Sequence, residues 1–215
     1  MSTPSSGKMM YGWKSIPWDK IQRNVFKLQK RIYRAEMQGD SKKVRKLQKL
    51  LTKSWSARML ATKRVSQDNQ GKNTAGIDGV KSLDDKGKLD LSEIIRKPGS
   101  KCPPVRRVWI PKPGSKEKRA LGIPTMETRA RQALIVSALE PQWEARFEPN
   151  SYGFRPGRSC HDALEGIFSN IRSKAKYCLD ADIAKCFDQI DHQALLQKLD
   201  TYPEMVPFWQ TVCMK

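Results

Sequence analysis

The sequence has few acidic residues, few cysteines and no long apolar run. Its 215 residues carry 22 Asp and Glu against 41 Lys and Arg. The five cysteines include no C-x-x-C pair, so neither a disulfide framework nor a zinc site is predicted, and Cys160 beside His161 does not change this. No apolar run reaches the roughly 18 residues of a membrane-spanning helix, and residues 1–13 have no apolar stretch typical of a signal peptide. We therefore expect a soluble, cytoplasmic protein without a membrane partner.

The sequence instead has a strong positive charge. The formal net charge is +19, the isoelectric point is near 9.9, and only 38% of the residues are apolar. A field of this sign attracts polyanions, and neutralised phosphates release counterions. We therefore predict a nucleic-acid partner whose binding weakens as salt rises. The length suffices for an ordinary core in one or two modest domains.

The first third of the chain has a helical period. Apolar residues follow a 4-3-4 spacing from Ile21 to Ile32, Gly39 and Asp40 interrupt the pattern, and the pattern resumes over residues 44–51. This spacing predicts two antiparallel helices, and a third helix is expected from Trp55 onward.

These helices are strongly cationic. Between Lys20 and Arg64 there are fifteen Lys or Arg and two acidic residues. A solvated helix face normally mixes charges of both signs, so the bias favours nucleic-acid contact over plain solvation. The representative phosphate donors that we predict for this face are Lys30, Arg31, Arg34, Lys42, Lys43, Arg45 and Lys46.

The rest of the chain mixes short and long elements. Residues 66–101 are predicted to form loops around a short helix at 89–95. A β-branched and aromatic run at 105–110, a basic turn and a second run at 119–123 predict a β-hairpin with a basic tip. Helical patterns cover 128–147 and 162–173, and residues 177–183 are predicted to form a buried strand. The expected fold class is α+β.

The predicted strand carries two carboxylates. In the run YCLDADI at 177–183, alternation places Asp180 and Asp182 on one face. Carboxylates flanked by apolar residues are costly to bury unless a cation satisfies them, and hard oxygen ligands suit Mg²⁺. An edge strand with solvated carboxylates explains the same spacing equally well.

The following run, DIAKCFDQIDH at 182–192, resembles motif A of the polymerase palm. It is similar in particular to the D-I-x-x-x-F-D-x-I segment of group II intron reverse transcriptases. Three upstream blocks also resemble that family, in the family's order. They are TAGIDGV at 74–80, RRVWIPK at 106–112 with RALGIPT at 119–125, and NSYGFRPGRS at 150–159.

The resemblance implies the fingers and a partial palm of a right-hand polymerase, behind a basic helical N-terminal extension. It divides the chain into the extension at 1–65, the fingers at 66–175 and the beginning of the palm at 176–215. Ala75 and Ala120 stand where the family commonly has Pro. The family's Y-x-D-D aspartates are not found in residues 190–215, so we expect no catalysis by this chain alone and expect a complementary palm and thumb chain as a partner.

The resemblance also implies roles for individual residues. Asp182 is the implied catalytic carboxylate, which binds two Mg²⁺ ions with help from the backbone carbonyl of Ile183. Lys112 and Arg119 are implied to grip the dNTP, whose site also includes Ile183 and Phe187. Phe187 is the implied aromatic gate against a ribose 2′-hydroxyl. Without the motif, a core aromatic explains Phe187 equally well.

The glycine-containing loop at 150–159 is an implied contact with the template. Arg155 and Arg158 alternate there with Gly153 and Gly157, which lets guanidinium and backbone groups approach a phosphate. A simple turn is the plainer explanation of the glycines.

Two functions follow from these residues. The first is part of an RNA-directed DNA polymerase of group II intron type, which binds intron RNA or template, a DNA primer and dNTP for intron mobility and splicing. The alternative is a non-catalytic, maturase-like RNA-binding module that assists the folding of an intron RNA.

Overall fold

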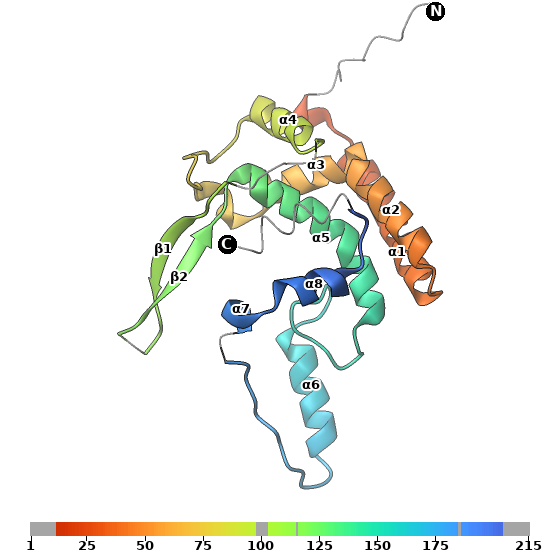
Figure 1. Cartoon of the computed structure of the whole chain (residues 1–215), viewed down its shortest axis with the longest axis vertical. Helices are drawn as coiled ribbons and strands as arrows, with labels where there is room; N and C mark the ends of the chain where they lie inside the picture. Colours follow the sequence, from red (N-terminus) through yellow and green to blue (C-terminus); the bar gives the residue numbers. More distant parts are fainter. Residues whose placement is uncertain (1–11, 98–102, 115, 185, 204–215) are drawn as a thin grey trace, which may run out of the picture.

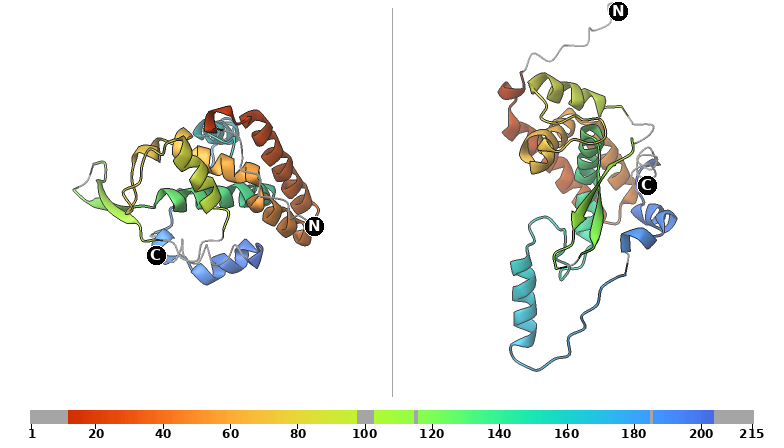
Figure 2. Two further views of the ribbon diagram at one scale, coloured as in Figure 1. Left: turned by 90° about the horizontal axis from the view of Figure 1, so that it is seen from above. Right: turned by 90° about the vertical axis from the view of Figure 1, so that its left-hand side faces the viewer.

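The structure is a computed structural model, which describes residues 12–97, 103–114, 116–184 and 186–203. A body of packed helices carries a β-hairpin, and α6 extends away from that body (Figures 1 and 2). The elements in chain order are η1 (Trp13–Ser15), α1 (Trp18–Met37), α2 (Ser41–Lys53), α3 (Trp55–Lys63), η2 (Arg64–Asp68), η3 (Gln70–Asn73), α4 (Asp85–Ile94), β1 (Arg106–Pro111), β2 (Lys118–Ile123), α5 (Met126–Arg146), α6 (Cys160–Ile171), α7 (Cys186–Gln189) and α8 (His192–Leu199). This mixture is compatible with the predicted α+β class.

The antiparallel pair of α1 and α2 confirms the prediction from the N-terminal periodicity. The inner face of α1 buries Ile21, Val25 and Ile32. The turn between the helices places Gly39 at a φ of 70°, a left-handed conformation that glycine adopts without strain. Asp40 then caps α2 by accepting a hydrogen bond from the backbone N–H of Lys43 at 3.0 Å.

Helix α5 lies at the centre of the helical body. It packs against α1, α2 and α3, and its buried residues include Ala130, Leu134, Ala138 and Leu139. These residues belong to a core that also draws side chains from α1 to α4 and from Leu199 at the end of α8. Its bounds confirm the long helix predicted at 128–147.

The predicted β-hairpin is also confirmed. Strands β1 and β2 pair antiparallel, with Val108 opposite Leu121 and Ile110 opposite Arg119. Within the described residues this pair is the whole sheet.

The prediction of a buried strand at 177–183 is wrong for this structure. The segment forms no strand, and Tyr177, Leu179 and Ile183 are exposed. A strand needs a hydrogen-bonding neighbour, and the only sheet in the described part of the chain does not extend to this segment.

The neighbouring helix α6 confirms the helix predicted at 162–173, but it buries none of its residues. Its apolar side chains recur at helical spacing, and each is more than half exposed. These residues are Leu164, Ile167, Phe168 and Ile171.

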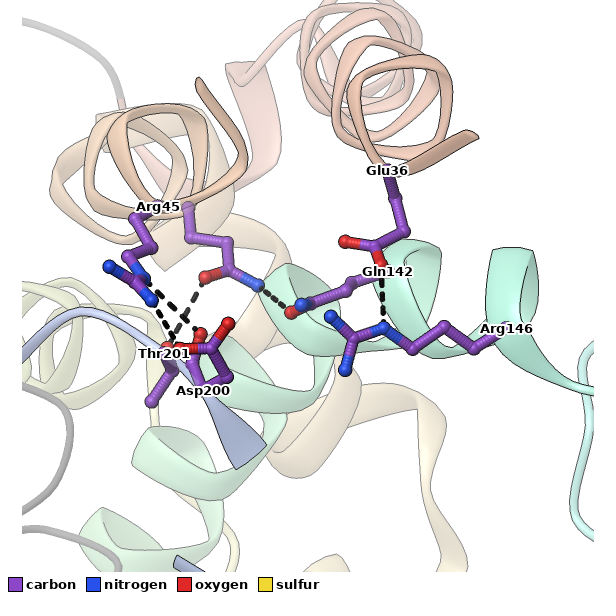
Figure 3. A network of polar contacts seen from close by, with 7 residues as sticks. Glu36, Arg45, Gln142, Arg146, Asp200 and Thr201 are labelled. Carbon is purple, nitrogen blue, oxygen red and sulfur yellow. Dashed lines mark hydrogen bonds and ion pairs between the residues drawn. The ribbon is translucent and has the colours of Figure 1, made fainter. Parts of the chain in front are cut away.

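Polar contacts near the C-terminal end of α5 fasten it to α1 and α2 (Figure 3). The buried Gln48 of α2 donates a hydrogen bond to the buried Gln142 at 2.6 Å and accepts one from Thr201 at 3.2 Å. Arg146 pairs with Glu36 of α1 at 2.6 Å. Buried amides that are paired in this way favour one arrangement of the helices, because any other would leave them unsatisfied.

Candidate nucleic-acid interface

Six of the seven predicted phosphate donors of the N-terminal helices are exposed. Residues 30, 31 and 34 lie on α1, away from its buried side, and residues 42, 43 and 46 lie on the first turns of α2. In the part of the chain that the structure describes, none of the six forms an ion pair with a carboxylate. We call Lys30, Arg31, Arg34, Lys42, Lys43 and Lys46 the cationic face.

An aromatic side chain lies beside this face. Phe26 is 58% exposed, and the Lys30 ammonium lies 5.4 Å from the centre of its ring. Tyr33 and Met37 are also exposed on α1. Cations interleaved with exposed aromatic rings are typical of surfaces that contact unpaired nucleotides.

The seventh predicted donor, Arg45, has a partner within the protein. Its guanidinium forms an ion pair with the carboxylate of Asp200, just beyond α8 (Figure 3). Its Nε also donates to the Asp200 carbonyl. The structure therefore makes Arg45 a link between α2 and the end of α8.

The β-hairpin places its two predicted dNTP contacts on one side. Alternation and the pairing of Ile110 with Arg119 put Arg119 on the same face as Lys112, one step beyond β1. The Lys112 ammonium lies 2.6 Å from the Glu117 carboxylate, and this hydrogen bond lowers the pKa of Glu117. The pair is exposed, so separating it costs little free energy.

The loop at 150–159 is held together by Arg155. Its Nε and Nη2 donate to the two carboxylate oxygens of Glu144 on α5, at 3.0 and 2.6 Å. Its Nη1 donates to the carbonyls of Glu148 and Ser151 at 2.6 and 2.8 Å. The side chain of Arg155 is only 4% exposed, so this guanidinium holds the loop in place while Arg158 alone is open to a phosphate.

The block at 74–80 is fastened to α5 and β1 by two arginines. Arg129 donates to the carbonyls of Gly71 and Thr74 at 2.6 and 2.7 Å, and Arg106 donates to the carbonyl of Ala75 at 3.0 Å. Burial lowers the pKa of Arg129, against the opposing field of Asp78. These hydrogen bonds give Arg129 a structural role in holding the block against α5.

The surroundings of Gly76 explain why the block at 74–80 has a glycine at this position. A Cβ at this position would lie 2.7 Å from the Cα of Thr125, at the N-terminus of α5. Backbone atoms cannot give way there as a flexible side chain can. The close approach of two backbones therefore excludes every other residue from this position.

Asp182 and its neighbours stand in the segment between α6 and α8. Asp182 is exposed, and its Oδ1 accepts the backbone N–H of Ile183 at 2.8 Å. The backbone of Phe187 lies in α7, whereas its side chain lies outside the described residues. The described residues hold no group of three His, Cys, Asp or Glu side chains able to share a metal ion. One carboxylate and one carbonyl supply part of the octahedral oxygen shell of a Mg²⁺ ion, which water, substrate phosphates or further carboxylates would complete.

The structure adds a groove that the sequence did not predict. It lies between α5 and α8 and has a volume of about 430 Å³. Its apolar walls include Leu139, Trp143, Phe147, Phe154, Leu195 and Leu199. Burial raises the pKa of Glu140 on the groove wall, against the lowering effect of Arg64.

Comparison with known proteins decides the family. Residues 13–95 match the N-terminal domain of reverse transcriptase, and residues 110–214 match reverse transcriptase (RNA-dependent DNA polymerase). The group II intron-encoded protein LtrA of Lactococcus lactis subsp. cremoris is 41% identical over 135 residues, which are 60% of this chain. The chain belongs to the group II intron reverse transcriptase and maturase family.

Two other relatives match more of the chain. Protein YkfC of Escherichia coli (strain K12) is 29% identical over 202 residues, and Maturase-like protein 1 of Euglena gracilis is 30% identical over 201, each covering 87% of this chain. The matched regions are 52% of YkfC, 42% of Maturase-like protein 1 and 22% of LtrA. The chain thus spans about half or less of the length of these relatives. Among the described residues, no helix has both the length and the apolar character needed to cross a membrane.

The ion pair at Arg155 predicts a specific pH dependence. The hydrogen bond from Arg155 lowers the pKa of Glu144 below its ordinary value of 4.5. A carboxylate with a lowered folded-state pKa stabilises the fold above its unfolded pKa, and this stabilisation is lost as the pH falls through the folded pKa. We therefore expect the free energy of unfolding to fall more steeply below about pH 4.5 in the wild type than in Glu144→Gln.

Urea unfolding from pH 6 down to pH 3 measures this difference. Glu148→Gln is the matched control, because Arg155 contacts only the backbone carbonyl of Glu148. It should keep the wild-type pH dependence. Parallel curves for the wild type and Glu144→Gln would contradict the assigned role of the pair.

Proposed function

We propose that this chain binds intron RNA through the cationic face of α1 and α2, as the N-terminal part of a group II intron reverse transcriptase. The observation that carries the proposal is the cationic face itself. Six exposed cations on two adjacent helices have no carboxylate partner among the described residues. Such a surface repels itself unless counterions or a polyanion neutralise it, and RNA phosphates release those counterions on binding.

The hairpin and the loop at 150–159 supply further donors for the same ligand class. Lys112 and Arg119 on one face of the hairpin are our proposed contacts with the dNTP triphosphate, since phosphoryl transfer needs cations on the phosphates. Arg158 is the proposed contact with a template phosphate, beside Arg155, which secures the loop. A DNA primer is the proposed partner for extension. Phe187 is the proposed gate that rejects a ribose 2′-hydroxyl.

Catalysis is proposed for Asp182, with Ile183 beside it, once further metal ligands are supplied. In the complete enzyme, two Mg²⁺ ions would stabilise the charge that develops on the transferred phosphate. Two exposed apolar features favour a complementary palm and thumb segment as the source of those ligands. They are the apolar face of α6 and the apolar side chains of residues 177–183, all of them exposed. Exposure of this much apolar surface to water is unfavourable unless a partner covers it.

The maturase-like alternative uses the same RNA contacts without chemistry. It draws support from relatives that are named as maturases, such as Maturase-like protein 1. The two functions differ only in whether Asp182 takes part in nucleotide addition.

Charge reversal tests RNA binding. The variant Lys30→Glu/Arg31→Glu/Arg34→Glu should bind an intron-derived RNA more weakly. Because each lost contact with single-stranded phosphate lowers the salt slope by about 0.7, the slope of log K against log salt should fall by about 2. Filter binding at several salt concentrations measures this slope.

The matched control is Lys81→Glu/Lys86→Glu/Lys97→Glu, which changes three exposed lysines outside the cationic face by the same charge. It should keep the wild-type salt slope. Equal losses of RNA affinity in the two variants would mean that the net charge of the protein, and not a specific site, determines binding. No RNA binding by the wild type would refute the proposal.

Primer extension tests catalysis. The chain mixed with a complementary palm and thumb polypeptide from a relative should extend a DNA primer on an RNA template. Asp182→Ala should abolish this activity, because its carboxylate is the proposed metal ligand. Asp90→Ala, which removes an exposed carboxylate of α4, is the control and should retain the activity. Primer extension that survives Asp182→Ala would show that Asp182 is not the metal ligand. Intact RNA binding without any primer extension by the wild type would favour the maturase-like function.

A further inference from the structure

Phe154 is held in a conformation that bulky residues seldom adopt. Its φ of 56° lies in the left-handed region, and its side chain is fully exposed to water. A flexible loop would relax this strain by turning the residue or covering the ring.

The loop cannot easily relax, because the next residue is locked. Arg155 donates four hydrogen bonds, two of them to Glu144 on the central helix α5. Its guanidinium also lies 5.6 Å from the centre of the Phe147 ring. At its far end, the loop closes with Ser159 and Asp162, which form a reciprocal capping box at the start of α6. The exposed ring of Phe154 is therefore presented by a rigid scaffold.

The surroundings of Phe154 indicate the chemistry of its ligand. The ring forms part of the rim of the α5–α8 groove, beside the aromatic walls Trp143 and Phe147. Arg158 is exposed four residues further along the same loop. An exposed ring and an exposed cation on one short loop fit a nucleotide, whose base would stack on the ring while its phosphate meets the guanidinium.

We propose that Phe154 is a stacking platform for one unpaired base of a bound RNA, with Arg158 on the adjoining phosphate. This rests on the proposed RNA binding and adds to it a site that selects single-stranded over paired RNA. Base pairs keep their faces stacked within a helix, whereas an unpaired base offers its face to the ring. The rigid presentation reduces the ordering cost of binding.

Two substitutions separate the ring from the backbone conformation. Phe154→Asn removes the aromatic face but tolerates the left-handed conformation, so the loop should keep its shape. Phe154→Trp keeps an aromatic face. Phe168→Leu removes another exposed phenylalanine, on α6, and serves as the control.

The experiment measures Kd for a single-stranded oligouridylate and for a blunt RNA duplex, at one salt concentration. Phe154→Asn should weaken binding to the single strand by about 5- to 150-fold, the range found when one stacking aromatic is removed. It should leave duplex binding unchanged. Phe154→Trp and Phe168→Leu should bind both RNAs like the wild type.

Other outcomes overturn the inference. Equal binding of the single strand by Phe154→Asn and the wild type would show that no base stacks there. An equal loss of affinity for both RNAs in Phe154→Asn would show that the ring has a structural role. If Phe154→Asn binds both RNAs like the wild type but loses primer extension in the mixture with the palm and thumb polypeptide, that polypeptide and not RNA covers the ring. If the wild type binds neither RNA, the proposed function itself fails.

Discussion

The structure depends on the packing of α5 against the N-terminal helices. A helix of 21 residues is about 31 Å long, and α5 contacts α1, α2 and α3 along this length. Its polar side chains then fix the parts that lie beyond the core. Arg129 holds the block at 74–80, Glu144 holds the loop at 150–159 through Arg155, and Gln142 meets Gln48 in the interior. Loss of α5 would therefore release the block at 74–80 and the loop at 150–159 and expose the buried faces of α1 to α3.

This packing also determines which surfaces remain for a ligand. The inner faces of α1 and α2 are used by the core, so their cations project outward from a rigid support. A net charge of +19 raises the electrostatic cost of this compact state. Neutralisation by RNA phosphates would remove that cost. Stability and function thus make opposite demands on the same lysines and arginines.

The sequence predicted the elements whose signals are local. The apolar spacing around Ile21 and Ile32 defined the first helices, and a β-branched and aromatic run before a Pro-Gly turn defined the hairpin. The sequence could not separate Arg155 from Arg158, because the buried pair with Glu144 exists only after folding. The ion pair of Arg45 could not be predicted for the same reason, since its partner Asp200 lies 155 residues away. The strand predicted at 177–183 failed because strand formation requires a neighbour that local sequence does not reveal.

The central claim is that RNA covers the cationic face of α1 and α2. Lysine acetylation read by mass spectrometry, with and without an intron-derived RNA, tests it most directly, because each lysine reports its own exposure. RNA should protect Lys30, Lys42, Lys43 and Lys46, while the equally exposed Lys81 and Lys86 should react as before. Uniform protection of all six lysines, or protection of Lys81 and Lys86 alone, would contradict the account.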